Sequence, residues 1–190
     1  MNTPLVLSLS PRAGGNSDAV ASYFARSLQH PVPVERLCNY KVQPCLGCNA
    51  CAGSGQCILA DQDQVEEIYA AMDRASGLLV VAPVYFYHLP AQAKAWIDRS
   101  QSRYLGRVDC DQDLPVAHPS RPAYVILVAA RTTGEKLFAG IMPTLRYFFK
   151  GFGFHIQDSL FLRGLDGPSD FKANTDAQAA VALLSGLSGW

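Results

Sequence analysis

The sequence predicts an α/β fold in which helices cover both faces of a parallel sheet. Short apolar runs of strand length alternate with stretches in which apolar residues recur every three or four positions. The strands are apolar at nearly every position, which is typical of a sheet that is buried on both faces. Strands that alternate with helices favour parallel pairing and right-handed crossovers. At 190 residues, with 49% hydrophobic and 17% charged residues, the chain is predicted to form a single domain over residues 1–190.

Five strands are predicted. They span residues 5–9, 32–37, 78–82, 124–129 and 154–162. Helices are expected between the strands. One should begin after Asn16 and Ser17, which offer N-cap side chains, and another after Asp61, which offers a second N-cap. Further helices are expected over 91–99, 137–148 and 176–187, with a kink at Pro143. Residues 103–120 are expected to form a polar loop, and residues 39–60 an excursion from the fold that is long enough to be functional. In a doubly wound sheet, ligands bind at the carboxyl ends of the strands, so the loops after the first, third and fourth strands are the places to search.

Composition excludes several classes of protein. Lys plus Arg is 16 and Asp plus Glu is 16, and this balance argues against a nucleic-acid binder and against electrostatic membrane binding. The longest apolar run, at residues 77–84, has the length of a strand and is too short to span a membrane. The N-terminus has no basic region before its apolar stretch, so no signal peptide is expected and the predicted location is cytoplasmic.

The loop after the first strand has the composition of a phosphate site. Hydroxyls, two glycines and one arginine lie between a buried strand and the start of a helix. Backbone N–H groups and the helix dipole favour an anion there, and an arginine adds a charged hydrogen bond. The loop contains neither a P-loop ending nor a G-x-G-x-x-G fingerprint. An ordinary strand-to-helix turn is the alternative interpretation.

The loop after the third strand is unusually aromatic. Tyr85, Phe86 and Tyr87 are consecutive, and His88 follows them. Such a loop could pack on a flat ring system, or it could be a hydrophobic cluster or an oligomer contact. With Trp96, these side chains offer more aromatic surface than one planar ligand covers, which predicts a homo-oligomer.

Four of the six cysteines are concentrated in thirteen residues. Cys45, Cys48, Cys51 and Cys57 form a C-x2-C-x2-C-x5-C run. The spacing is typical of thiolates that share a [4Fe–4S] cluster, while zinc, a reversible disulfide and four buried thiols remain alternatives. Cys38 and Cys110 stand apart and are expected to be small buried residues rather than ligands.

Taken together, these motifs resemble those of a known family. Ser10-Pro11-Arg12 with Gly15-Asn16-Ser17 is similar to the first flavin loop of NAD(P)H-dependent FMN reductases. Pro83-Val84-Tyr85-Phe86, followed by Ala91-Gln92-x-Lys94-x-x-Ile97-Asp98-Arg99, is similar to their second flavin loop, although Tyr87-His88-Leu89-Pro90 replaces a smaller turn that contains glycine. The cysteine run resembles that of the iron–sulfur flavoprotein branch. The resemblance extends from the first strand to about Phe152.

The resemblance implies a flavodoxin-like fold with strand order 2-1-3-4-5, bound FMN and a homodimer or homotetramer. It implies that the phosphate is held by Ser10, Arg12, Asn16 and Ser17. The isoalloxazine would lie against Pro83, Val84, Tyr85, Phe86, Tyr87 and His88, with Arg131 as a further contact. The iron ligands would be Cys45, Cys48, Cys51 and Cys57.

The activity implied is that of an oxidoreductase that takes electrons from NAD(P)H through FMN. They would pass to a flavin, quinone, nitro compound, oxygen or protein carrier, either directly or through a [4Fe–4S] cluster, and no protein acid or base is required. The alternative is a non-enzymatic electron carrier or redox-sensing module of the flavodoxin kind. Flavodoxins are usually strongly acidic, so the neutral charge of this chain favours the enzyme.

Overall fold

A five-stranded parallel sheet forms the centre of the molecule. The protein is described by a computed structural model that covers residues 3–105 and 120–190. The strands are β1 (Leu5–Ser8), β2 (Val34–Arg36), β3 (Leu78–Pro83), β4 (Arg121–Val128) and β5 (Phe154–Leu162). Their order in the sheet is β2-β1-β3-β4-β5, and every pair is parallel. Both the fold class and the strand order predicted from the sequence are confirmed.

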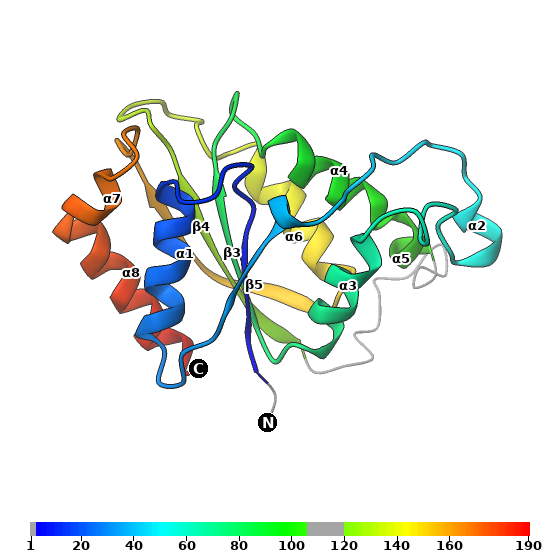
Figure 1. Ribbon diagram of the computed structural model, residues 1–190, viewed down its shortest axis with the longest axis horizontal. Helices are drawn as coiled ribbons and strands as arrows, with labels where there is room; N and C mark the ends of the chain where they lie inside the picture. The colour runs from blue at the N-terminus through cyan, green and yellow to red at the C-terminus, as the bar shows by residue number, and fades with distance from the viewer. Residues whose placement is uncertain (1–2, 106–119) are drawn as a thin grey trace.

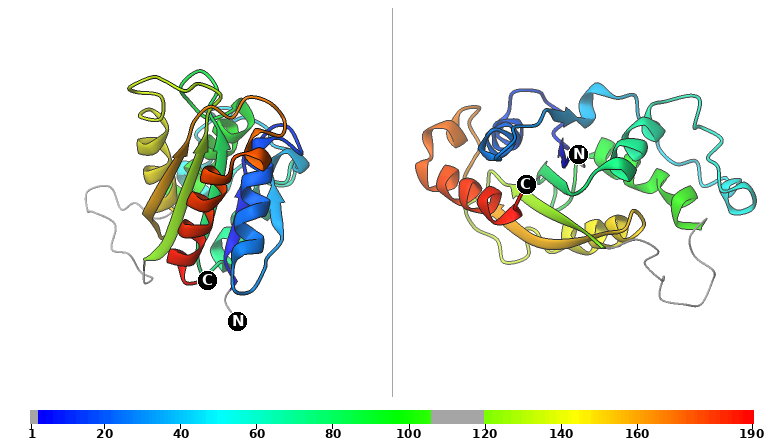
Figure 2. Two further views of the ribbon diagram at one scale, coloured as in Figure 1. Left: turned by 90° about the vertical axis from the view of Figure 1, so that its left-hand side faces the viewer. Right: turned by 90° about the horizontal axis from the view of Figure 1, so that it is seen from below.

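Helices cover both faces of the sheet, as Figures 1 and 2 show. One face carries α1 (Asn16–Ser27), α7 (Asp170–Ala173) and α8 (Thr175–Ser188), and the other carries α3 (Val65–Arg74), α4 (Ala91–Arg99) and α6 (Ile141–Lys150). Three short helices complete the described chain: η1 (Leu37–Asn39), α2 (Cys51–Ser54) and α5 (Gln101–Leu105). None of the helices in the described ranges is long and apolar enough to cross a membrane.

The two sides of the sheet bury separate hydrophobic clusters. The central strand β3 contributes alternate residues to each cluster, with Leu78 and Val80 facing α3, α4 and α6, and Leu79 and Val81 facing α1 and α8. Trp96 of α4 is fully buried, with its ring 4.6 Å from that of Phe148. The expectation that Trp96 adds to an exposed aromatic surface is therefore wrong, because its side chain packs into the core.

Several helix boundaries differ from those predicted. The N-cap of α1 is Gly15, with no side-chain cap bond, and α3 begins at Val65 rather than after Asp61. Helix α6 begins at Ile141 and runs unbroken through Pro143. Because Pro143 lies in the first turn, where N–H groups have no partner within the helix, it costs no hydrogen bond and produces no break. Residues 103–105 belong to α5 rather than to a polar loop; the rest of that predicted loop up to 119, Cys110 included, lies outside the described residues.

Candidate functional site

The loops after β1, β3 and β4 leave the sheet at one edge. The amide of Leu9 donates to Val81 O at 2.8 Å, and the amide of Val84 donates to Val128 O at 2.9 Å. These bonds continue the β1–β3 and β3–β4 ladders to the ends of the strands, so the three loops begin side by side. Figure 1 shows the loops after β3 and β4 rising together beyond the sheet. The carboxyl edge of a parallel sheet is where ligands bind in this architecture.

The side chain of Asp18 holds the loop after β1 in place through hydrogen bonds. Its buried carboxylate accepts a hydrogen bond from Ser8 Oγ at 2.5 Å and another from the amide of Gly14 at 2.9 Å. The same carboxylate pairs with Arg36 Nε at 2.9 Å, which balances its charge. Asp18 stands at the third position of α1, from which an acidic side chain can reach back to the start of its helix. This position is the signal that could have identified Asp18 from the sequence.

Arg12 remains available at the mouth of the loop. Ser10 Oγ donates to Arg12 O at 2.7 Å and accepts from its amide at 3.2 Å, which fixes the turn. The exposed Arg12 side chain lies against Gly15, where an added Cβ would stand 3.4 Å from Arg12 Nε. No carboxylate in the described ranges pairs with Arg12. The loop therefore presents an unpaired guanidinium next to the first, free N–H groups of α1.

The side chain of Asn16 has a different role from the one predicted. Its amide nitrogen donates to Gly167 O at 2.8 Å, and its carbonyl oxygen accepts from the amide of Phe171 at 3.0 Å. These bonds tie α1 to the segment around α7, so the side chain already has partners at both polar ends. Ser17 is buried in the first turn of α1. Arg12 and the free backbone N–H groups are the parts of this loop best placed to meet an anion.

The aromatic loop is a two-residue hairpin turn with unusual backbone geometry. Tyr85 and His88 exchange both of their N–H···O bonds, at 2.8 and 2.9 Å. Between them, Phe86 has a φ of 49° and Tyr87 a φ of 63°. Positive φ at both central positions is the pattern of a type I′ turn, which normally takes Asn-Gly. Two bulky aromatic residues are strained there, and strain of this kind gathers at functional sites.

The turn packs on the loop after β4. Arg131 lies over the Tyr87 ring at 5.9 Å and donates from Nη1 to its hydroxyl at 3.4 Å. His88 Nε2 stands 3.4 Å from Thr144 Oγ1, at the start of α6. Pro83 and Val84 are half-buried at the end of β3, while Phe86 is fully exposed. The structure thus brings the predicted contacts from 83–88 and Arg131 together, with an aromatic tip left open.

A cavity of about 680 Å³ lies beside the first loop but away from the aromatic turn. It is lined by Ala13 and Gly14 together with residues of α1, α7 and β2. Neither Arg131 nor any of residues 83–88 lines this cavity. The cavity therefore borders the loop after β1 but not the aromatic turn or Arg131.

The segment that carries the four clustered cysteines, residues 41–64 (the cysteine segment), has its two ends joined by hydrogen bonds, which form its base. The amide of Gln64 donates to Lys41 O at 2.9 Å, and the amide of Lys41 donates to Gln64 Oε1 at 3.0 Å. One step further in, the amide of Gln43 donates to Asp63 Oδ2 at 2.8 Å. These bonds join residues 41–43 to residues 62–64, so the chain between them, which carries the four clustered cysteines, forms a loop with its two ends held together.

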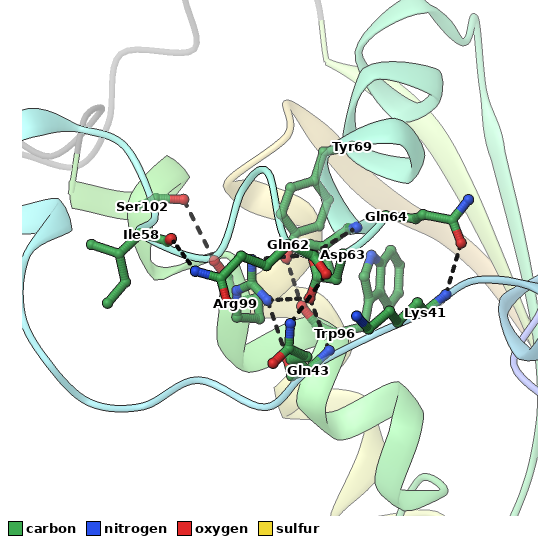
Figure 3. Close-up of polar contacts among 11 residues, drawn as sticks. Lys41, Gln43, Ile58, Gln62, Asp63, Gln64, Tyr69, Trp96, Arg99 and Ser102 are labelled. Carbon is green, nitrogen blue, oxygen red and sulfur yellow. Dashed lines mark hydrogen bonds and ion pairs between the residues drawn. The ribbon is translucent and has the colours of Figure 1, made fainter.

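A buried ion pair holds this base against α4, as Figure 3 shows. Arg99 Nη1 lies 2.5 Å from Asp63 Oδ2 and also donates to Gln43 O at 3.2 Å, and both charged side chains are fully buried. Burial alone would lower the pKa of Arg99, but the hydrogen bond with Asp63 and the nearby Cys57 and Asp63 charges raise it above its usual value. Arg99 is the last residue of α4, where a cation is also favoured by the helix dipole. No sequence pattern pairs Arg99 with Asp63, which lies 36 positions earlier.

All four clustered cysteines line one small cavity. It measures about 50 Å³ and is also lined by Arg99, Gln101 and Ser102. Cys45 and Cys48 are exposed, Cys51 and Cys57 are half-buried, and all are free thiols. Cys38 does not line this cavity; it is half-buried in η1, where its thiol stands 3.8 Å from Asn39 Oδ1.

These thiols surround the cavity without meeting at one point. Within residues 3–105 and 120–190, no three His, Cys, Asp or Glu side chains converge as ligands of one metal ion. A tetrahedral zinc ion needs its thiolates on a single centre. A [4Fe–4S] cluster takes four cysteine ligands around a larger group, and the four residues of the cysteine run all line one cavity.

Helix α4 connects the two candidate sites. Its N-cap, Pro90, follows the aromatic turn, and its last residue, Arg99, lines the cysteine cavity. The helix has nine residues, so these ends stand about 13 Å apart along its axis.

Comparison with protein families agrees with this arrangement. The model of the NADPH-dependent FMN reductase family matches residues 4–136, which include all three loops of the sheet edge up to Lys136 and the cysteine segment. The chain belongs to this family. Members of this family are oxidoreductases.

Curated relatives of this chain include iron–sulfur flavoproteins. One from Methanosarcina thermophila is 37% identical over 97 residues, which are 50% of this chain and 50% of the relative. Another from Methanocaldococcus jannaschii is 33% identical over 103 residues, or 53% and 52% of the two chains. The chain thus matches about half the length of these relatives.

Solved structures of low sequence identity share the fold. The Trp repressor binding protein of Bacillus subtilis has a TM-score of 0.64 at 19% identity, covering 96% of this chain and 98% of its own. The NAD(P)H:quinone oxidoreductase of Methanothermobacter marburgensis has a TM-score of 0.65 at 18% identity, covering 100% and 95%. The fold of this chain is therefore flavodoxin-like.

Proposed function

We propose that this protein is an FMN-dependent oxidoreductase that takes electrons from NAD(P)H and carries a [4Fe–4S] cluster as a second redox group. The observation that carries the first part is the sheet edge itself. Three adjacent loops present an unpaired arginine, free helix N–H groups and a strained aromatic turn, and the chain belongs to a family of FMN reductases. Bound FMN would accept hydride from the nicotinamide and release electrons to an acceptor.

Each of the three loops has a distinct part in this proposal. Arg12 and the first N–H groups of α1 bind the phosphate of FMN, and Ser10 fixes the turn that presents them. The half-buried Pro83 and Val84 and the aromatic residues after them bind the ring system. Arg131 holds Tyr87 in place across the neighbouring loop. No side chain is required to move a proton, because hydride passes directly between the two ring systems.

The cysteine segment fits the second redox group. Cys45, Cys48, Cys51 and Cys57 are free thiols around one cavity, which supports their role as the four ligands of the cluster. The relatives named iron–sulfur flavoproteins also support it. A cluster at this end of α4 would exchange single electrons with a protein carrier, while the flavin end would serve NAD(P)H and small acceptors such as quinones or nitro compounds.

A homo-oligomer is also part of the proposal. Phe86 is fully exposed at the tip of the aromatic turn, and Tyr85 and Tyr87 are exposed beside it. Aromatic side chains of this kind are enriched at protein interfaces. A second copy of the chain that covers the turn would bury them next to the flavin.

Iron and acid-labile sulfide analysis after anaerobic reconstitution tests the ligand assignment. The parent should bind about four iron atoms per chain, and Cys48→Ser should lose the cluster while it keeps FMN. Cys38→Ser is the matched control, because Cys38 lies outside the cavity and should bind iron like the parent. A parent protein that takes up flavin but no iron would disprove the cluster and leave the flavin assignment standing.

A further inference from the structure

One fully buried cation lies against the cysteine cavity. Arg99 lines the cavity together with the four cysteines, and its side chain has no exposure to solvent. A buried charge is costly unless something compensates it, so an arginine in this position needs an explanation. The pairing with Asp63 gives part of it.

The hydrogen bonds that hold the Arg99 guanidinium are made by its two terminal nitrogens, Nη1 and Nη2. Asp63 Oδ2 and Gln43 O accept from Nη1, and Asp63 Oδ1 lies 3.4 Å from Nη2. Asp63 is itself fixed, because it also accepts from the amides of Gln43 and Val65. The guanidinium is therefore oriented by groups whose positions are set by the base of the loop.

The remaining donor of Arg99 has no partner. Nε is buried and makes no hydrogen bond. Buried donors without a partner are rare in folded proteins, so this one calls for an explanation such as a bound group or a redox role. Cys57 lines the same cavity as Arg99. The unused donor and the nearby thiol both belong to residues that line the cysteine cavity.

We propose that Arg99 stabilises the bound iron–sulfur cluster by donating a charged hydrogen bond to its sulfur shell, through Cys57 or an adjacent sulfide. The inference rests on the cluster proposed above and adds a residue that determines how firmly the cluster is held and how easily it is reduced. Asp63 acts through Arg99 and is a positioning residue.

The expected direction of the effect follows from charge. Four thiolates around a [4Fe–4S] core form an anion, and the gain of one electron adds one further negative charge. A buried cation and a hydrogen bond to sulfur both favour the more negative state, so Arg99 raises the reduction potential. It also favours retention of the cluster, because the thiolate ligands are stabilised against protonation and loss.

A purely structural role for Arg99 makes a different prediction. If Arg99 only tied the base of the loop to α4, its replacement would change stability but not the potential of an intact cluster. Arg99→Lys separates the two cases. Lysine keeps the charge and can still pair with Asp63, but it has no fixed Nε–H to direct into the cavity.

The experiment compares Arg99→Lys with Arg103→Lys in the reconstituted protein. Arg103 is the matched control because it pairs with Glu66 and Asp73 and does not line the cysteine cavity. At a fixed potential, Arg99→Lys should lower the ratio of reduced to oxidised cluster about tenfold, which corresponds to 59 mV for a one-electron couple. It should also release iron several times faster in air, while Arg103→Lys should match the parent in both respects. FMN content should be the same in all three proteins.

A second variant covers the case in which lysine still reaches the sulfur. Asp63→Asn with Arg99→Met removes both buried charges together, so no unpaired ion is left inside. This protein should retain FMN, and any cluster it binds should be harder to reduce than that of the parent. A parental potential and parental iron retention in both variants would overturn the inference about Arg99. Failure of the parent itself to bind iron would instead overturn the proposed cluster and, with it, this role.

Discussion

The sheet edge and the cysteine segment are built in opposite ways. The loops after β1, β3 and β4 are placed by the sheet, because adjacent parallel strands must end at the same edge. Their internal bonds are short-range, such as Ser8 with Asp18 and Tyr85 with His88. The cysteine segment leaves after β2 and is held by a contact between Asp63 and Arg99, two residues that are far apart in sequence.

This difference shows which kind of site depends on a single side chain. The sheet edge has many backbone bonds, and the loss of one side chain should change ligand binding more than stability. A few hydrogen bonds hold the two ends of the cysteine segment together, and one buried ion pair joins these ends to α4. The loss of either member of the pair should therefore affect both the fold and the cysteine cavity.

The largest effect is expected from Asp63→Ala. The variant leaves the buried charge of Arg99 unpaired and removes the acceptor for the amides of Gln43 and Val65. Loss of one partner from a buried pair costs about 3–5 kcal/mol of unfolding free energy. Urea denaturation followed by circular dichroism measures this change.

The control for this experiment is Asp98→Ala on the same helix as Arg99. Asp98 pairs with Lys94 at the surface, and both side chains are more than 40% exposed. Loss of that pair should cost less than about 1 kcal/mol. Equal destabilisation by the two substitutions would show that the buried pair does not anchor the segment.

The next effect concerns FMN affinity at the sheet edge. Arg12→Ala should remove a charged hydrogen bond to the phosphate, a loss of about 1.5–3 kcal/mol or roughly ten- to a hundredfold in affinity. Stability should not change, because Arg12 is exposed and has no carboxylate partner among the described residues. Flavin fluorescence titration gives the dissociation constant.

Arg26→Ala is the matched control for Arg12→Ala. Arg26 is also exposed and lies in the last turn of α1, at the opposite end of the helix from the loop. Its variant should bind FMN like the parent, and riboflavin, which lacks the phosphate, should bind the parent much more weakly. Equal FMN affinity in Arg12→Ala and Arg26→Ala would contradict the phosphate assignment.

The contrast between the two regions also explains how far the sequence alone could reach. Alternating apolar runs predicted the sheet, its strand order followed from the family resemblance, and the topology then placed Arg12 and Tyr85 at one edge. Side-chain partners were beyond such reasoning. The family resemblance predicts that Asn16 holds the phosphate, yet its side-chain amide bonds the segment around α7. The prediction that Trp96 adds to an exposed aromatic surface is wrong because the sequence of a helix does not show what its aromatic face packs against.

The buried pair of Asp63 and Arg99 is the clearest example of what sequence patterns leave out. Asp63 belongs to no motif, and the motif that ends at Arg99 does not include its partner. Their contact exists only after residues 41–43 and 62–64 have come together. Local patterns report backbone preference and burial. They do not report a pairing that depends on how an irregular loop folds back on itself.

The smallest effect is expected at the aromatic turn. Phe86→Asn with Tyr87→Gly supplies the residues that a type I′ turn favours, and relief of the positive φ angles should stabilise the protein by about 1–2 kcal/mol. The same change removes the exposed aromatic tip, so self-association should weaken. Thermal unfolding and light scattering measure the two effects.

Phe86→Ala separates the effect of backbone strain on stability from the effect of the exposed ring on self-association. Alanine removes the exposed ring but keeps a Cβ at positive φ, so it should weaken self-association without the gain in stability. If the paired substitution fails to stabilise the protein, the turn is not strained. If neither variant changes the oligomeric state, the tip is not a subunit contact.

The central claim is that the two ends of α4 hold two independent redox groups. The most direct test measures flavin, iron and sulfide in anaerobically purified and reconstituted protein, for the parent and for Arg12→Ala and Cys48→Ser. We predict about one FMN and one [4Fe–4S] cluster per parent chain, a weakened hold on flavin with unchanged iron in Arg12→Ala, and unchanged flavin without iron in Cys48→Ser. A parent with neither group, or variants that lose both groups together, would contradict the account.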